Sequence, residues 1–141
     1  MKIRVMLAGT LLSAAFAAGA LAATTMYKAD LKGSQEVPAN DSKGTGNAEL
    51  SYDPASKKLS WKVTYSGLSG SATAAHIHGP ADPGKDAAVV IKFENPASPI
   101  EGSATLTDAQ AADLQGGKWY VNVHTAEHKS GEIRGQVMPA K

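Results

Sequence analysis

The alternation of apolar and polar side chains between positions 58 and 66 constrains the fold more than any other feature of this sequence. Leu59, Trp61, Val63 and Tyr65 occupy every second position, and serine, lysine or threonine stands between them. Successive side chains of a strand point to opposite faces, so this pattern predicts a strand with one buried face. The preceding Asp53-Pro-Ala-Ser56 has turn composition, with proline where its fixed φ is favoured. Residues 44–66 are therefore predicted to form a β-hairpin.

The rest of the chain after residue 25 consists of short apolar or alternating segments separated by glycine, proline, asparagine and serine. Thr107 and Gln110 match a capping box, and Gly116-Gly117 can end a helix, so one helix is expected over 107–115. Short strands with frequent turns and one helix predict an all-β fold, an antiparallel sandwich or barrel. Beside the hairpin, strands are expected at 26–31, 72–78, 87–94, 100–106, 119–125 and 132–138.

The N-terminus has the three parts of an export signal. Lys2 and Arg4 supply positive charge, residues 5–21 are almost all apolar or small, and Ala20-Leu21-Ala22 matches the A-x-A cleavage pattern. We expect residues 1–22 to be a cleaved signal peptide, residues 23–141 to form one domain, and the protein to be periplasmic or secreted. A retained membrane anchor is the alternative, but glycines and polar residues interrupt the apolar run and no basic stop-transfer cluster follows.

Charge and cysteine content exclude several functions. Without Lys2 and Arg4, 12 basic residues face 13 acidic ones, a net charge of about −1 with neutral histidines. This balance argues against binding to nucleic acid or to an anionic membrane. The chain has no cysteine, which excludes disulfides, thiolate metal sites and a blue-copper centre. A hydrophobic core, or a bound metal, must hold the domain together.

The histidines carry the clearest chemistry in the sequence. His76 and His78 flank Ile77, so in a strand they point the same way, roughly 7 Å apart. His124 lies on the polar face of the strand predicted over 119–125. Zinc and copper both bind neutral imidazole, so three histidines on polar strand faces are typical of a metal site. The alternative is structural, with the histidines hydrogen-bonded to nearby groups so that they hold a loop in place.

Several other polar residues are candidates near this site. His128, in the loop after His124, could be a fourth ligand or simply solvated. Asp82, Asp86 and Glu132 could supply oxygen ligands or orient an imidazole N–H. Arg134 shares a strand face with Glu132, which indicates either a salt-bridged face or an arginine that attracts an anion or holds a carboxylate. No G-x-S-x-G motif marks a nucleophile, and no glycine spacing indicates a phosphate site.

Three segments carry a resemblance to a known family. They are Leu31–Pro38 (LKGSQEVP), Ala74–Pro80 (AAHIHGP), and Tyr120–Thr125 (YVNVHT) leading to Gly131–Gln136 (GEIRGQ). Together they resemble the CHRD domain, the module named after chordin and also found in exported bacterial proteins. The resemblance covers essentially the whole chain after the signal, and it departs from the family where Val37-Pro-Ala39 lacks a second proline.

The resemblance implies an immunoglobulin-like sandwich or barrel with a distant similarity to copper/zinc superoxide dismutases. In those enzymes a strand H-x-H and a later histidine bind copper, and His76, His78 and His124 match that order and type. No histidine between His78 and His124 corresponds to the bridging and zinc-site positions. This implies a mononuclear site rather than a dinuclear one.

We therefore expect an exported domain that is not an enzyme and that binds a metal ion, copper rather than zinc, through these histidines. One alternative is a structural or protein-interaction domain with hydrogen-bonded histidines, whose partner would be another exported protein. The other alternative is a mononuclear dismutase-like redox enzyme.

Overall fold

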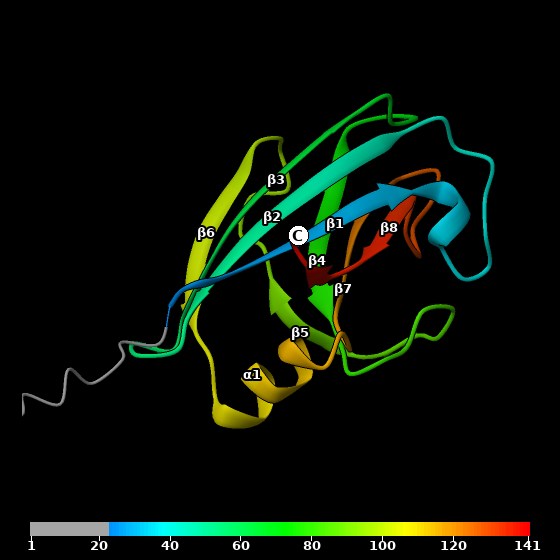
Figure 1. The fold of residues 1–141 in the computed structure, drawn as a ribbon. Coiled ribbons are helices and arrows are strands. Elements are labelled where there is room, and N and C mark those ends of the chain that lie inside the picture. Colours follow the sequence, from blue (N-terminus) through cyan, green and yellow to red (C-terminus); the bar gives the residue numbers. More distant parts are fainter. Residues whose placement is uncertain (1–22) are drawn as a thin grey trace, which may run out of the picture.

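The computed structural model describes residues 23–141, so the signal peptide predicted over residues 1–22 lies outside the described part of the chain. The described residues form one antiparallel sheet with one short α-helix (Figure 1). No helix among them is long and apolar enough to span a membrane. The strands are β1 (Thr25–Lys32), β2 (Thr45–Asp53), β3 (Lys58–Ser66), β4 (Ala72–His78), β5 (Val89–Lys92), β6 (Ile100–Thr105), β7 (Tyr120–Thr125), β8 (Ile133–Gln136) and β9 (Met138–Pro139); the helices are a 3-10 turn, η1 (Gly33–Gln35), and α1 (Asp108–Gln115).

The strands follow the order β5-β4-β7-β8-β1-β2-β3-β6, and β9 pairs with β1 beside this path. Every neighbouring pair is antiparallel. Figure 1 shows the sheet curling on itself, with β1, β2, β3 and β6 on one side, β4, β5 and β7 on the other, β8 next to β1, and α1 at one end. The prediction of an all-β antiparallel fold with one short helix is therefore confirmed.

The β2–β3 hairpin forms where the alternating pattern predicted it. Asp53 pairs with Lys58 at its end, and the Asp53 carboxylate accepts hydrogen bonds from the Ala55 amide at 2.9 Å and the Ser56 hydroxyl at 3.0 Å. Lys57 closes the turn in the left-handed region, at φ 58°. The helix also begins as predicted, because Thr107 and Gln110 make both hydrogen bonds of a capping box.

One face of every strand from β1 to β8 contributes to a single hydrophobic core. Leu59, Trp61 and Val63 of β3 are buried, and Tyr65 at the end of β3 is partly buried against the same cluster. Alternation by two residues explains this arrangement, since the polar side chains between them point outward. The other core residues include Tyr27, Leu31, Leu50, Tyr52, Ala75, Ile77, Phe93, Ile100, Leu114, Trp119, Val121, Val123, Ile133 and Val137.

Two predicted strands differ from those observed. β5 begins at Val89 instead of residue 87. The Ala87 amide donates a hydrogen bond to the Tyr120 hydroxyl and the Ala87 carbonyl accepts one from His78, so neither group pairs with a neighbouring strand. The segment predicted as one strand over 132–138 is divided, since β8 pairs with β7 whereas Met138 of β9 pairs with Lys28 of β1. The chain thus changes partner near its C-terminus.

Candidate metal centre

Strands β4 and β7 lie side by side and place their histidines on the outer face of the sheet. Ile77 is fully buried in the core, so His76 and His78 on either side of it point outward. The register pairs Ala74 with His124 and His78 with Tyr120, which brings His124 beside the two β4 histidines. The strand pairing therefore assembles the three histidines that the sequence predicted.

The three imidazoles converge on one small volume. Nδ1 of His76 lies 3.2 Å from Nε2 of His124. The ring centroid of His76 lies 5.4 Å from that of His78 and 5.0 Å from that of His124. One ring nitrogen from each residue lies within 4.8 Å of the other two. This is the one group of three or more potential ligands that the described residues contain.

Backbone carbonyls determine the tautomers of two of the rings. Nδ1 of His124 lies 2.8 Å from the carbonyl of Lys129, and Nδ1 of His78 lies 2.9 Å from the carbonyl of Ala87. A carbonyl only accepts, so both Nδ1 atoms carry the proton. When these rings are neutral, Nε2 of each keeps its lone pair. Histidines that bind metals are commonly oriented in this way.

Burial keeps two of the imidazoles in the neutral form at pH 7. It lowers the pKa of His76 from 6.5 to about 4, and repulsion by His124 and then His78 acts in the same direction. Burial also lowers the pKa of His78, against hydrogen bonds to Ala87 and Asn122 that raise it. Neutral imidazole is the form that binds a metal ion.

Asn122 of β7 lies opposite His76 of β4, and its side chain contacts His78. Its Oδ1 lies 3.0 Å from Nε2 of His78, the nitrogen that has no proton when the ring is neutral. Two acceptors do not bond, so this contact requires either a charged His78 or an amide turned so that its nitrogen donates. In the second case, Asn122 is the group that gives up its hydrogen bond when His78 binds an ion.

An aromatic stack supports His78 from behind. The Tyr120 ring is parallel to the His78 ring, with centroids 4.8 Å apart and an interplanar angle of 2°. The Tyr120 hydroxyl accepts a hydrogen bond from the Ala87 amide at 3.0 Å. Because the Ala87 carbonyl binds His78, Tyr120 positions both the ring and its hydrogen-bond acceptor.

Arg134 secures the same loop from the other side of Tyr120. Its guanidinium carbon lies 3.5 Å from the centroid of the Tyr120 ring, and the residue is only 2% exposed. Nη1 donates to the Asp86 carboxylate at 3.0 Å, and Nη2 donates to the Lys85 carbonyl. The ion pair with Asp86 agrees with a salt-bridged strand face and equally with an arginine that holds a carboxylate.

The acidic candidates are not members of the three-histidine group, and each has other partners. Asp82 is paired with Lys118, and Asp86 with Arg134. Glu132 is fully buried, and its carboxylate accepts hydrogen bonds from the hydroxyls of Ser42, Ser69 and Thr125. Its pKa is lowered to about 2, since these hydrogen bonds outweigh the burial that raises it. Backbone carbonyls, which no sequence motif marks, orient the histidines instead.

His128 lies outside the three-histidine group. Its Nε2 is 4.0 Å from the Glu132 carboxylate, and its backbone amide donates to the Thr125 hydroxyl at 3.2 Å. Its carbonyl accepts from the Thr125 and Gly131 amides, which closes the loop after β7. The contacts of His128 thus belong to the Glu132 network.

One buried acid was not singled out in the sequence. Glu36 is 7% exposed, and its Oε1 has no hydrogen-bond partner among the described residues. Burial raises the pKa of Glu36 to about 7, although the charge of Arg134 lowers it. Its position in the segment Leu31–Pro38 was the available signal, because that segment carries part of the family resemblance.

Comparison with known proteins gives one match. The model of the family described as the CHRD domain matches residues 27–137, from β1 to the residue after β8. No curated protein and no solved structure matches the chain. The matched range includes all three clustered histidines together with Tyr120 and Arg134.

Proposed function

This chain belongs to the CHRD domain family, and we propose that its domain binds one transition-metal ion through His76, His78 and His124. The observation that carries the proposal is the convergence of three imidazole nitrogens within 4.8 Å of one another. The export signal predicted at the N-terminus makes the periplasm or the extracellular space the compartment in which the ion is bound.

The distances support a single ion. Ligand nitrogens about 2.0–2.1 Å from a tetrahedral zinc or copper lie roughly 3.3 Å from one another. His76 and His124 already meet this separation, at 3.2 Å. His78, which is partly exposed, must approach the other two rings by a side-chain movement in which its contact with Asn122 is given up.

The prepared tautomers also support binding. Nε2 of His124 lies 3.2 Å from Nδ1 of His76, while the Nδ1 protons of His124 and His78 are held by the carbonyls of Lys129 and Ala87. An ion must displace the proton that His76 shares with His124 and the contact between His78 and Asn122. Little conformational entropy is then lost on binding, because the protein has already oriented two of the three rings.

Copper is favoured over zinc by the donor set. Among divalent first-row metals, Cu²⁺ forms the strongest complexes with nitrogen ligands. Three histidines also leave at least one coordination position open for water or for a further ligand. Asp82, Asp86 and Glu132 are occupied by other partners, so a fourth protein ligand from this group would require breaking an ion pair or a buried network.

The second candidate function is structural. The hydrogen bonds of His76 to His124 and of His78 to Ala87 satisfy ring nitrogens without any ion. In this case the histidines would connect β4, β7 and the loop before β5, and the domain would act by binding another exported protein. A metal titration separates the two functions.

We would titrate the metal-free domain, residues 23–141, with Cu²⁺ and Zn²⁺ in separate calorimetric experiments. The proposal predicts one ion per chain, tighter binding of Cu²⁺, and a Cu²⁺ electron paramagnetic resonance spectrum with coupling to several nitrogens. A superoxide assay on the copper-loaded domain then distinguishes a metal-binding protein from a dismutase-like enzyme. Absence of binding by the wild-type domain would leave the structural function.

A further inference from the structure

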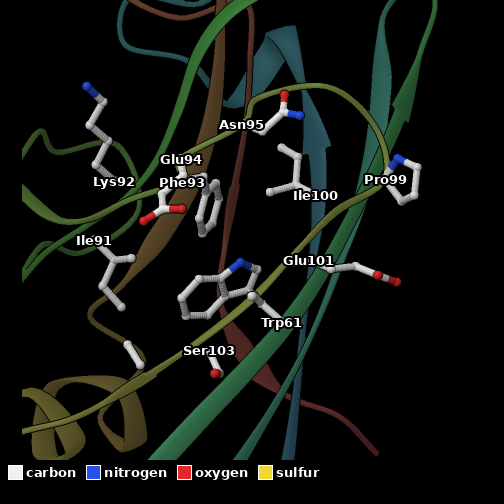
Figure 2. A pocket seen from close by; sticks show the side chains of 12 residues that line it. Trp61, Ile91, Lys92, Phe93, Glu94, Asn95, Pro99, Ile100, Glu101 and Ser103 are labelled. Atoms are coloured by element: carbon white, nitrogen blue, oxygen red, sulfur yellow. The ribbon is translucent and has the colours of Figure 1, made fainter.

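A cleft separates the two ends of the curled sheet. β5 pairs only with β4 and β6 pairs only with β3 among the described residues, so each has one free edge. Between these edges lies an open cavity of about 570 Å³ (Figure 2). The free edge of a strand carries backbone N–H and C=O groups that can pair with another extended chain. This cleft thus has such groups along both of its sides.

An aromatic pair forms the floor of the cleft. The Trp61 ring lies against Gly102 of β6, where a Cβ atom would come within 2.7 Å of the indole. The ring reaches Phe93, just after β5, with centroids 5.2 Å apart. Glycine at position 102 therefore allows Trp61 to span the gap between the two strands, and the cleft has an apolar base.

Side-chain anchors keep the strands apart at the closed end. The segment that links β5 to β6 passes over the end of β3, where the Tyr65 hydroxyl donates to the Pro96 carbonyl at 2.6 Å. The Tyr65 amide also donates to the Ser98 hydroxyl at 3.2 Å. The linker is thus attached to β3. Strands β5 and β6 do not pair with each other. The cleft is thus a preformed feature of the fold.

A buried donor in the floor lacks an acceptor within residues 23–141. Trp61 is 9% exposed, and its indole N–H has no hydrogen-bond partner among the described residues. Figure 2 shows this nitrogen on the side of the ring toward Phe93 and Ile100, both of which line the cleft. A buried N–H without an acceptor is unfavourable, so an occupant would be stabilised if its carbonyl met this nitrogen after the indole turned toward the cleft.

We propose that the cleft binds an extended peptide segment of another protein, which pairs antiparallel with the free edge of β6. Alternation along β6 determines the side chains that fit. Ile100, Gly102 and Ala104 face the core side with the aromatic floor, whereas Glu101 and Ser103 face solvent. A peptide strand placed beside them would direct alternate side chains to the same two sides.

The charges on the rim favour a basic peptide. Glu94 and Glu101 lie on the two walls of the cleft, and both side chains are exposed; Lys62 of β3 stands opposite Glu101 on its paired side, so a peptide on the free edge would meet Glu101 from the other side. Lys92 is the one cationic residue among those that line the cleft, and its side chain shares the outer face with its cross-strand partner His76. The preferred ligand therefore alternates small apolar residues, directed inward, with lysine or arginine, directed outward. Opposite charges across strands stabilise such a pair.

The probe is the acetylated and amidated pentapeptide lysine-valine-lysine-valine-lysine, titrated into the isotopically labelled domain and followed by amide chemical shifts. We expect saturable shifts confined to β5, β6 and the indole N–H of Trp61. The same peptide with methyl groups on alternate backbone nitrogens cannot pair along its edge, and should produce no saturable shifts.

Variants test whether the residues that line the cleft contribute to peptide binding. The double substitution Glu94→Lys and Glu101→Lys should weaken binding about tenfold, since the cross-strand attraction at Glu101 and the attraction of Glu94 on the opposite wall both become repulsive. Glu49→Lys is the matched control, because Glu49 is also an exposed strand residue but lies on β2, and it should leave binding unchanged. Trp61→Phe keeps an aromatic floor without the N–H and should weaken binding about fivefold.

Three results would overturn the proposal. The first is the absence of saturable shifts at millimolar peptide, and the second is equal binding of the methylated peptide. The third is concentration-dependent shifts of the same edges without peptide, which would make a second copy of this chain the occupant.

Discussion

Nδ1 of His76 and Nε2 of His124 are 3.2 Å apart, although the two residues are separated by 48 positions in the chain. Neutral His124 offers a lone pair at Nε2, because its Nδ1 donates to the Lys129 carbonyl. His76 then donates the single proton between the two rings. A metal ion and this proton compete for the same place, which makes the contact the centre of the following predictions.

The three histidines should behave as one unit. Changing His76, His78 or His124 singly to alanine is expected to remove most of the Cu²⁺ affinity, and changing two should do little more, since ligands of one site are not independent. His128→Ala is the matched control. It also removes an imidazole, but this ring lies beside Glu132 and is not part of the three-histidine group. Calorimetric titration of each variant measures the affinity. Tight binding that survives both His76→Ala and His124→Ala would exclude the site.

Tyr120→Phe should weaken metal binding more than it weakens the fold. The change keeps the ring stacked on His78 but removes the hydroxyl that bonds the Ala87 amide at 3.0 Å. Loss of such an indirect support is expected to lower affinity by about 10–100-fold, with a stability loss of about 1 kcal/mol.

Tyr65→Phe provides the control for that comparison. It removes a hydroxyl that donates to the Pro96 carbonyl at 2.6 Å, but Tyr65 lies on β3, which pairs with neither β4 nor β7. Its stability loss should be similar, and its metal affinity should equal that of the wild type. Equal affinity losses in the two variants would show that Tyr120 acts only through general stability.

Trp61→Ala should be strongly destabilising. Trp61 is 9% exposed and contacts Phe93 and Gly102, so truncation leaves a large cavity between β3 and β5. Losses for buried tryptophan are about 3–5 kcal/mol in the free energy of unfolding. Lys62→Ala, at the neighbouring exposed position, should change it by less than about 0.5 kcal/mol. Chemical denaturation measures both, and a small loss for Trp61→Ala would place this residue outside the core.

Glu132 should make the fold sensitive to acid. Its pKa in the folded state is about 2, against an ordinary value of 4.5, so in this range the unfolded chain binds more protons. The resulting stabilisation is complete above about pH 5, is lost as the pH falls toward 2, and is on the order of 3 kcal/mol. Unfolding of wild type and Glu132→Gln at several pH values tests this. The variant should be less stable at pH 7 and should lose less between pH 5 and 2; parallel curves would contradict the prediction.

Export should remove the first 22 residues. The A-x-A pattern at Ala20-Leu21-Ala22 predicts cleavage before Ala23. The intact mass of the protein recovered from the periplasm or the medium should match a chain that starts at Ala23. A mass that includes Met1 would favour a retained anchor.

Local patterns were enough to predict most of the strands and the helix. The period of two in β3 decided which side chains enter the core, and Asp53-Pro-Ala-Ser56 and the Thr107–Gln110 capping box located a turn and a helix start. The same period placed His76 and His78 on one face. These features depend only on residues close in sequence, so they can be derived from the sequence alone.

The completed site depends on strand pairing that no local pattern specifies. β7 lies beside β4 with a register that sets Ala74 opposite His124, and only this register brings the third imidazole to the first two. The carbonyls of Ala87 and Lys129 orient the rings, yet every residue has a carbonyl, so composition does not identify them. Likewise, the cleft between β5 and β6 exists because the two ends of the curled sheet stop short of pairing. Sequence determined which chemical groups point outward, and long-range packing decided which of them meet.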